Sequence, residues 1–309
     1  MKTTTKPPIV LNKKMSLLSE IKRSWISYLF ISPFYLVFLI FGVFPIIFSV
    51  NLSFQRWNGI SAPLFVGLDQ YVALFHDADF WQSLVNTLII WVESTVPMII
   101  LALIIAFLLN TKKLTGTHVY RSLFFLPNVT SIVAVAIVFS TLFGNKYGLI
   151  NFLLTSCGLE AQPWLKQPAL LQVAISSMGV WRWTGYNAII FLAGLQKIDY
   201  SLYESARIDG ASTFKVFWKI ALPLLNPVIM FVVITSTIGG LQIFTEPQVL
   251  VGNNGGAGGG GMTIVLYLYR QAFIRTSFGY AAAVSWMLFF IIGIFSLLNW
   301  FLVNKANKE

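Results

Sequence analysis

Charged side chains are scarce in this sequence of 309 residues, where Asp, Glu, Lys and Arg make up 10% of the chain against 57% hydrophobic residues. Soluble globular domains carry about 25% charged residues, so the composition excludes an ordinary soluble domain. The mean hydropathy of +0.75 agrees. The few charges are also unequal in sign, because 21 Lys and Arg stand against 11 Asp and Glu. The composition therefore predicts a basic integral membrane protein.

Residues that hold metals or attack substrates are equally sparse. The single cysteine, Cys157, excludes an intramolecular disulfide and a thiolate cluster for a metal. The two histidines, His76 and His118, lie far apart in predicted loops, and no HExxH, GxSxG or Ser/His/Asp grouping is present. The segment "GGAGGGGMT" at 255–263 has glycines but lacks the lysine of a Walker A sequence. We therefore expect no enzyme activity, no metal, no cofactor and no ATP hydrolysis by this chain itself.

Long apolar runs are what the sequence has in abundance. A helix needs about 20 apolar residues to cross a hydrocarbon core of about 30 Å, whereas a membrane barrel would show alternating segments of about 10 residues. The first run is too long for the core of a signal peptide and has no small-residue cleavage site behind it, so it should remain in the mature protein. We predict an all-α, polytopic bundle of six transmembrane helices. Their ranges are about 28–50, 85–109, 122–143, 169–195, 220–244 and 280–303.

The positive charges fall mainly on one side of these six runs. Fifteen Lys and Arg precede run one, separate runs two and three or four and five, or follow run six, while five lie in the other loops and Arg182 lies within run four. The positive-inside rule therefore predicts cytoplasmic N- and C-termini, with residues 1–24 as a basic cytoplasmic tail and 25–309 as the membrane domain. The sequence has no basic face with interleaved aromatic residues, so it does not suggest nucleic-acid binding.

Run four contains "WRWTGYN" at 181–187, which places an arginine among residues at membrane depth. Ionisable groups there usually face a bundle interior or an aqueous cavity. Glu93 in run two is the only carboxylate at comparable depth, so a buried Glu93–Arg182 ion pair is one interpretation. The other is that Arg182 lies near a helix end and extends its charge to the interface.

Run five contains the small and hydroxylated stretch "ITSTIGGLQ" at 234–242. Such residues let helices approach closely, which alone explains many of them. The functional interpretation is a solute path, because uncharged donors and acceptors beside aromatic rings suit a neutral polyhydroxyl solute. The candidate path residues are Trp181, Arg182, Trp183, Tyr186, Asn187, Thr235, Ser236, Thr237 and Gln242.

A polar island at about 197–219 separates runs four and five. Ser201 and Glu204 have the spacing of a capping box, which predicts a helix starting near Ser201. Gly210 supplies a left-handed turn, and Ser212 or Thr213 can cap a second helix. In that helix an apolar face can lie against the bundle with the lysines in water. The residues of this face are Phe214, Phe217, Trp218 and Ala221.

The island reads "ESARIDGASTFKVFWKIALPLLNP" from 204 to 227, and it resembles the EAA loop of permease subunits in ATP-binding-cassette importers. Ser205 stands where that motif usually has alanine, a small-for-small change. The resemblance extends over about 28–303 to the sugar-permease branch of the family, through segments such as "FISPFYLVFLIFGVFPIIFSVNLSF", "WRWTGYNAIIFLAGLQKI" and "GYAAAVSWMLFFIIGIFSLL". Relatives often have a shorter "GGP" where this chain has glycines at 255–261. The residues carried over as the ATPase-coupling set are Ser201, Glu204, Ser205, Ala206, Asp209 and Gly210.

The resemblance implies a type I importer permease fold and a function in sugar or oligosaccharide import. It also implies a second permease subunit, usually a different gene product, two copies of a separate ATPase that binds the ATP, and an external solute-binding protein. The location would be the inner membrane of a bacterium or archaeon. A homodimer, an importer of a non-sugar solute, a secondary transporter and a membrane enzyme remain as alternatives. A secondary transporter would need coupling-ion carboxylates at mid-membrane and usually internal repeats.

Overall fold

The computed structural model describes residues 24–110 and 116–306. The predicted basic tail at 1–24 lies outside the described residues except for Ser24, as do Lys112 and Lys113. The chain divides into two units, Met1–Asn51 and Leu52–Glu309. We describe each unit by itself.

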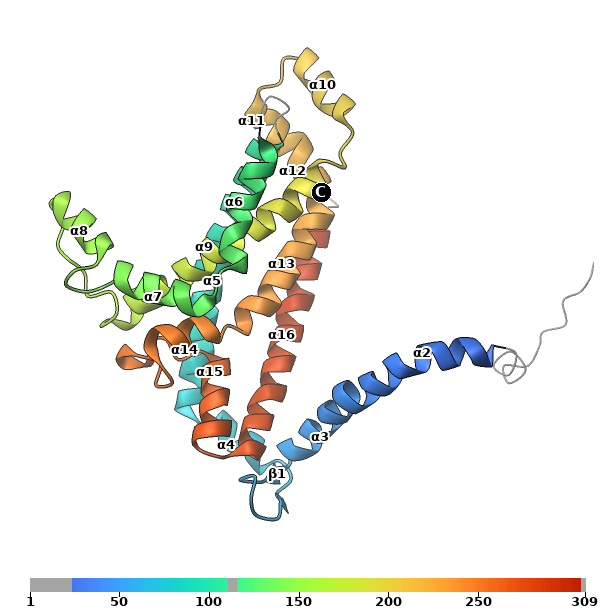
Figure 1. The fold of residues 1–309 in the computed structure, drawn as a ribbon, viewed down its shortest axis with the longest axis vertical. Helices are drawn as coiled ribbons and strands as arrows, with labels where there is room; N and C mark the ends of the chain where they lie inside the picture. The colour runs from blue at the N-terminus through green and yellow to red at the C-terminus, as the bar shows by residue number, and fades with distance from the viewer. Residues whose placement is uncertain (1–23, 111–115, 307–309) are drawn as a thin grey trace, which may run out of the picture. The chain divides into compact units, whose positions relative to one another are not determined.

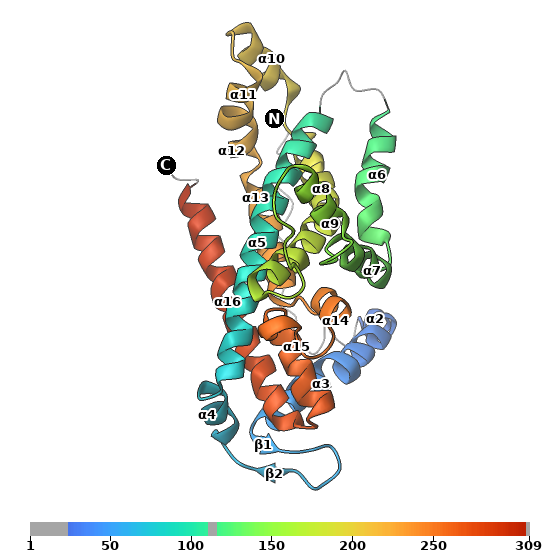
Figure 2. The ribbon, with the colours of Figure 1, turned by 90° about the vertical axis from the view of Figure 1, so that its left-hand side faces the viewer.

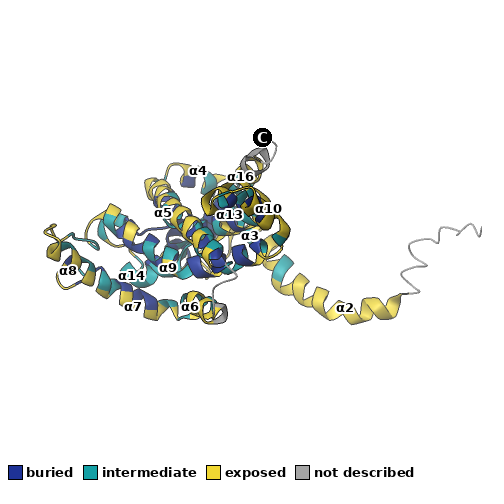
Figure 3. Cartoon of the chain, turned by 90° about the horizontal axis from the view of Figure 1, so that it is seen from above, coloured by how far each residue is buried: buried dark blue, intermediate teal, exposed yellow. Residues whose placement is uncertain are grey.

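The described part of the first unit is one apolar helix. α2 (Trp25–Phe38) continues through a π-helical turn, η1 (Leu39–Val43), into α3 (Phe44–Ser53), so that 29 residues form a single candidate span. This confirms a helix where the sequence predicted the first run. The helix is hydrophobic all round, and none of the α2 side chains is buried (Figure 3). A helix of that kind requires a membrane or another protein around it.

The second unit begins with a two-residue antiparallel hairpin and is otherwise helical (Figure 1). In chain order its elements are β1 (Gln55–Arg56), β2 (Leu64–Phe65), α4 (Asp69–Phe75), α5 (Ala78–Leu109), α6 (Thr117–Val129), α7 (Ile132–Leu142), α8 (Leu149–Ser156), α9 (Pro168–Leu195), α10 (Tyr200–Ile208), α11 (Thr213–Val216), η2 (Phe217–Ala221), α12 (Leu222–Leu224), α13 (Asn226–Leu241), α14 (Thr245–Val251), η3 (Ala257–Gly259), α15 (Ile264–Tyr269), η4 (Arg270–Ile274) and α16 (Phe278–Ala306).

The long helices α5 and α9 form the centre of this unit. Small residues bring them together, since Ala102 and Ala106 of α5 and Ala188 of α9 are completely buried in one apolar cluster with Phe191. Gly185 of α9 lies directly against the backbone carbonyl of Phe124 in α6, where a side chain would overlap. Close approach through small residues is the usual way in which membrane helices associate. α13 and α16 complete the bundle around α5 (Figure 2).

Within residues 24–110 and 116–306, four helices are long and apolar enough to cross a membrane, or five if a bent pair counts as one span. The four are Trp25–Ser53, Ala78–Leu109, Asn226–Val251 and Phe278–Phe301. α9 has 28 residues, which at 1.5 Å per residue gives about 42 Å, but "WRWTGYN" makes it too polar to satisfy the same criterion. The structure therefore supports a polytopic helical bundle and leaves the number six as a proposal.

The predicted run at 122–143 is not one straight helix, because α6 and α7 meet at an angle of 91°. Pro127 has no amide to donate within the helix, and Thr130 leaves the helical region with ψ of 144°. The Thr130 hydroxyl instead donates to the Leu126 carbonyl at 2.8 Å. Proline together with Thr and Ser side chains that compete for backbone carbonyls ends α6 here.

The glycine-rich segment at 255–261 lies between two helical stretches and is held by neighbouring helices. Residues 245–251 and 264–274 are helical, and the glycines between them are packed and hydrogen-bonded. Asn86 of α5 donates to the carbonyls of Gly259 and Met262 at 2.8 and 3.2 Å. Gln172 of α9 donates to the Gly260 carbonyl at 3.2 Å and to the Asn86 side chain at 3.0 Å. The buried side-chain amides of Asn86 and Gln172 thus donate to backbone carbonyls of the segment, which glycine side chains could not do.

The loops that the sequence predicted to share a side do share an end of the second unit. α10–α12 lie at one end, with the end of α5 and the last part of α16 directed toward it, and the hairpin and α4 lie at the other (Figures 1 and 2). At the hairpin end the amide of Phe278 in α16 donates to the Trp57 carbonyl at 3.1 Å. The helices of the bundle therefore run between two distinct ends.

Candidate functional site

A polar cavity of about 370 Å³ opens between α5, α9, α13 and α14. Its volume falls within the range of about 300–1,000 Å³ that is typical of small-molecule sites. The hydroxyl and amide side chains of Ser94, Thr95, Asn187, Thr235 and Gln242 line it beside aromatic rings. It combines polar groups with flat apolar surfaces, as a saccharide site requires.

The structure brings most of the predicted solute-path residues together in this polar cavity. Asn187 is buried, and its amide donates to the Trp183 carbonyl at 3.0 Å and to the Met98 sulfur at 3.2 Å. The Thr235 hydroxyl is occupied by the Phe231 carbonyl at 2.8 Å. The predicted residues that line the cavity are Trp183, Tyr186, Asn187, Thr235, Ser236 and Gln242.

Three of the predicted path residues do not line the polar cavity. Thr237 is completely buried, and its hydroxyl accepts from Asn299 of α16 at 2.9 Å, since one helical step turns it away from the face of Thr235 and Ser236. Trp181 lines a different cavity. Arg182 is among the lining residues of neither one.

Glu246 is a lining residue that the sequence analysis missed. It stands in the first turn of α14 and reaches the polar cavity because the chain leaves helix α13 at Gln242 and enters α14 at Thr245. The predicted fifth run ended at 244, which assigned Glu246 to an external loop. The apolar "VLV" that follows "EPQ" is the signal that could have extended the run.

The predicted Glu93–Arg182 ion pair is not formed among the described residues. The Glu93 carboxylate accepts from the Ser176 hydroxyl at 3.2 Å, while Nε and Nη1 of Arg182 are shielded from solvent without a hydrogen-bond partner. Six residues separate Ser176 from Arg182 on α9, which turns their side chains about 120° apart around the helix.

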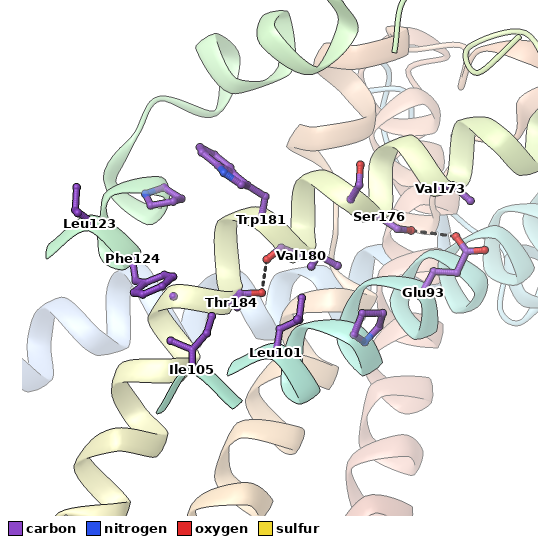
Figure 4. A pocket seen from close by; sticks show the side chains of 14 residues that line it. Glu93, Leu101, Ile105, Leu123, Phe124, Val173, Ser176, Val180, Trp181 and Thr184 are labelled. Atoms are coloured by element: carbon purple, nitrogen blue, oxygen red, sulfur yellow. Dashed lines mark hydrogen bonds between the residues drawn. The ribbon is translucent and has the colours of Figure 1, made fainter. Parts of the chain in front are cut away.

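Glu93 lines a larger cavity of about 790 Å³ between α5, α6 and α9 (Figure 4). Its other walls are mostly apolar, including Leu101, Phe124 and Trp181. The hydroxyl of Thr184 donates back to the Val180 carbonyl at 2.6 Å, so its proton is not available to a solute. The smaller cavity is therefore the better candidate for a polyhydroxyl solute.

At the end of the unit near α10, residues 199–216 form a knob of two short helices joined by a turn, here called the α10–α11 knob. α10 begins at Tyr200, one residue before the predicted start near Ser201, because the side chain of Asp199 caps it and accepts from the Ser201 amide at 3.0 Å. That hydrogen bond lowers the pKa of the Asp199 carboxyl. Gly210 has φ of +75°, and the Ala211 amide donates to the Ala206 carbonyl at 2.9 Å, as in a Schellman ending.

The α10–α11 knob is fixed to the bundle on one face and exposed on the other. Tyr203 and Ala206 are buried in the cluster that also contains the ends of α5 and α9. Burial raises the pKa of the Tyr203 hydroxyl. Glu204 and Ile208 point outward and are exposed, Ile208 to 85%. A partner protein can therefore contact α10 without disturbing its attachment.

The second helix of the knob contacts the bundle with only part of the predicted face. Ser212 caps it by accepting from the Lys215 amide at 3.3 Å. The predicted Ala221 is buried and Phe217 packs against the same cluster, together with Val216, whereas Phe214 is 72% and Trp218 52% exposed. The π-helical turn η2 changes the helical period within this segment, so a pattern counted at 3.6 residues per turn follows its buried face only in part.

The sequence comparison identifies the type of protein to which these two features belong. Residues 10–303 match the sequence profile of the family described as "binding-protein-dependent transport system inner membrane component". The chain belongs to this family.

Relatives of this transport family align over nearly the whole chain. The lactose transport system permease protein LacF of Rhizobium radiobacter is 39% identical over 90% of this chain and 94% of its own length. The arabinooligosaccharides transport system permease protein AraP of Bacillus subtilis is 38% identical over 88% of this chain and 86% of its own. A solved bacterial transporter for the acidic polysaccharide alginate has a chain of similar fold, with 25% identity, a TM-score of 0.79, and coverage of 94% of this chain and 99% of that one.

Membership of the transport family has two direct consequences for this chain. It is a membrane permease component of an ATP-driven importer and not an enzyme, because ATP hydrolysis in such importers belongs to a separate subunit. Its fold is that of type I importer permeases.

Proposed function

We propose that this chain is the permease subunit through which a bacterial or archaeal importer carries a sugar or oligosaccharide across the inner membrane. The solute passes through the polar cavity between α5, α9, α13 and α14, and a separate ATPase drives the passage through the α10–α11 knob. The names of LacF and AraP support the choice of saccharide. The aromatic and hydroxyl lining of the cavity supports it independently.

The single observation that carries the proposal is the two-faced structure of α10. Its inner residues Tyr203 and Ala206 belong to the same buried cluster as Ala106 and Leu195, at the ends of α5 and α9. A displacement of α10 therefore acts on the two helices that wall the cavity. Packed elements of this kind transmit small shifts because they do not deform continuously.

The residues proposed to couple the permease to the ATPase lie on and around α10. Glu204 is the polar contact, and Gly210 forms the turn that fixes α10 against the following helix. Ligand-driven motion requires a partner whose binding energy differs between two states of the permease, and the closing ATPase dimer is that partner. The full set is Ser201, Glu204, Ser205, Ala206, Asp209 and Gly210.

We propose the remaining assembly and topology on the same basis. α9 serves as a further span and the bent α6–α7 pair as another, which makes six with the four apolar helices. Residues 1–24 form a cytoplasmic tail, residues 25–309 form the permease domain, and both termini lie in the cytoplasm. The partners are a second, different permease subunit, two ATPase subunits and an external solute-binding protein. Sequence support for the orientation is the distribution of Lys and Arg.

Two variants test the coupling role of the knob. Reversing the charge in Glu204→Lys removes the polar contact, and Gly210→Val places a β-branched residue at φ of +75°, which strains the turn. We expect each to lower saccharide uptake about 10-fold or more, since a lost hydrogen bond to a charged group is worth about 1.5–3 kcal/mol. Uptake of labelled saccharide by cells expressing the complete importer measures this.

The control for these variants is Glu160→Lys, the same charge change at an exposed position between α8 and α9. It should transport normally, and all three proteins should reach the membrane in equal amounts. Full uptake by both Glu204→Lys and Gly210→Val would remove the coupling role from α10.

A further inference from the structure

The charge of the polar cavity rests on a single lining residue. Among the described residues that line it, Glu246 is the one acidic or basic side chain. The other polar lining groups are hydroxyls and amides, from residues such as Ser94, Thr95, Ser236 and Gln242. A solute that enters the cavity therefore meets one carboxylate in otherwise uncharged surroundings.

The acceptor capacity of Glu246 is largely unused by the protein. No hydrogen bond from another residue reaches its carboxylate in the described part of the chain, and it forms no ion pair with Arg182 there. The side chain is half-buried. A half-buried carboxylate without donors carries a desolvation cost that a bound ligand with donors would offset.

Arg182 does not line the polar cavity. Its shielded Nε and Nη1 have no hydrogen-bond partner among the described residues. No described positive side chain therefore stands beside Glu246 in the lining of the cavity, and Glu246 is the lining residue that can accept hydrogen bonds from a solute.

We propose that Glu246 makes the cavity select a neutral saccharide over an acidic one. This inference rests on the proposed function and specifies the solute class of the same site. The two carboxylate oxygens can accept hydrogen bonds from sugar hydroxyls, while Trp183 and Tyr186 offer faces for the sugar C–H groups. A uronic-acid carboxylate at the same place would meet a like charge, which disfavours binding. The cavity thus differs in kind from one that would suit an acidic polysaccharide.

Saccharide binding to the assembled importer tests this inference directly. The permease pair with its ATPase is placed in nanodiscs, without the external binding protein, and saturation-transfer NMR measures the binding of lactose, arabinotriose and an alginate trisaccharide. We expect the wild type to bind a neutral sugar and not the alginate trisaccharide. Glu246→Gln should weaken neutral-sugar binding about 10-fold and allow the acidic trisaccharide to bind. Glu246→Asp, which keeps the charge, should retain the exclusion.

The matched control is Glu93→Gln, which neutralises the other carboxylate at membrane depth but lines the larger, apolar cavity. It should leave both binding signals unchanged, and an equal effect of this variant would overturn the assignment to Glu246. Binding of the alginate trisaccharide by the wild type, absence of neutral-sugar binding, or an unaltered preference in Glu246→Gln would also overturn it. If the wild type binds the acidic sugar but the importer still takes up a saccharide, the selectivity of Glu246 is refuted and the proposed function stands. If the importer takes up no saccharide, the proposed function itself is contradicted.

Discussion

Asp77 joins three elements at the hairpin end of the second unit. Its side chain caps α5 by accepting from the Asp79 amide at 2.9 Å, and it also accepts from the hydroxyls of Tyr267 and Tyr280. Burial alone would raise the pKa of the Asp77 carboxyl, but these hydrogen bonds outweigh it, so the pKa lies below the ordinary value of 3.8. The ionised form is the one that holds α5, α15 and α16 together.

Asp77→Asn should therefore destabilise the purified protein in a pH-dependent way. Asn is as good an N-cap as Asp, so the variant keeps the helix cap. It loses only the negative charge of the group that accepts the two tyrosine hydrogen bonds. Because the folded pKa is lowered, the stabilisation is complete above the unfolded pKa of about 3.9 and disappears as the pH falls through the folded value. Thermal unfolding in detergent at pH 7 and at pH 3 measures the difference.

A difference between wild type and Asp77→Asn that is equal at the two pH values would contradict this account. Asp79→Asn is the control, because Asp79 is 58% exposed and its contact with Arg270 spans 3.8 Å. An exposed ion pair of that kind is worth about 0–1 kcal/mol, so the control should change little.

Individual residues were predicted from the sequence where local chemistry decides their place. The turn at Gly210 and the cap at Ser212 are confirmed because both depend on neighbours in the chain. Which cavity Glu93 and Glu246 line depends on how the helices are rotated against each other and on where α13 ends. No local sequence pattern contains this information. The sequence therefore indicated intramembrane charge but not which carboxylate lines the polar cavity.

At the scale of elements, the length of each apolar run predicts the helices. The breaks between helices occur where proline or a hydroxyl side chain interrupts the backbone hydrogen bonds. The apolar runs at 28–50, 85–109 and 280–303 are helical as predicted. The bend between α6 and α7 has a signal in Pro127 with Thr130 and Ser131, which a hydropathy window averages away. The packed glycine segment has no signal of its own, because its backbone partners come from α5 and α9.

The glycine segment should lose its structure when its amide partners are removed. In Asn86→Leu the carbonyls of Gly259 and Met262 lose a buried donor, which costs about 1–3 kcal/mol for each unsatisfied group. We expect a lower unfolding temperature and faster amide exchange at residues 255–263. Hydrogen exchange with mass spectrometry on the purified protein measures both the site and the size of the effect.

Gln82→Leu is the matched control for this element, since the exposed Gln82 side chain makes one bond of 3.3 Å to the Gly258 carbonyl. Its exchange pattern should resemble that of the wild type. Unchanged exchange in Asn86→Leu would mean that steric packing alone holds the glycines.

For the whole molecule, the orientation in the membrane is open to a test with single cysteines. Cys157 is the sole cysteine and is exposed after α8. In intact cells a membrane-impermeant maleimide should modify Cys157. In a Cys157→Ser background, Lys215→Cys in the α10–α11 knob should react only after the cells are permeabilised. Labelling is read from the mass of the purified protein.

The Cys157→Ser protein alone should remain unlabelled under both conditions. Modification of Lys215→Cys in intact cells would place the knob outside and contradict both the orientation and the proposed contact with an ATPase. The distribution of Lys and Arg predicted this orientation before any coordinates, because the rule depends on counts of charge and not on packing.

The π-helical turn at Phe217–Ala221 has a consequence for how the chain can vary in length. Such a turn closes its hydrogen bonds over five residues instead of four, so it holds one residue more than a regular turn. Removing one residue there would leave an ordinary α-helical turn, with the segments before and after it in their original angular register. Removing one elsewhere between Thr213 and Leu224 would instead rotate everything upstream by about 100°. Natural length differences in this linker are therefore expected to cluster at that single turn.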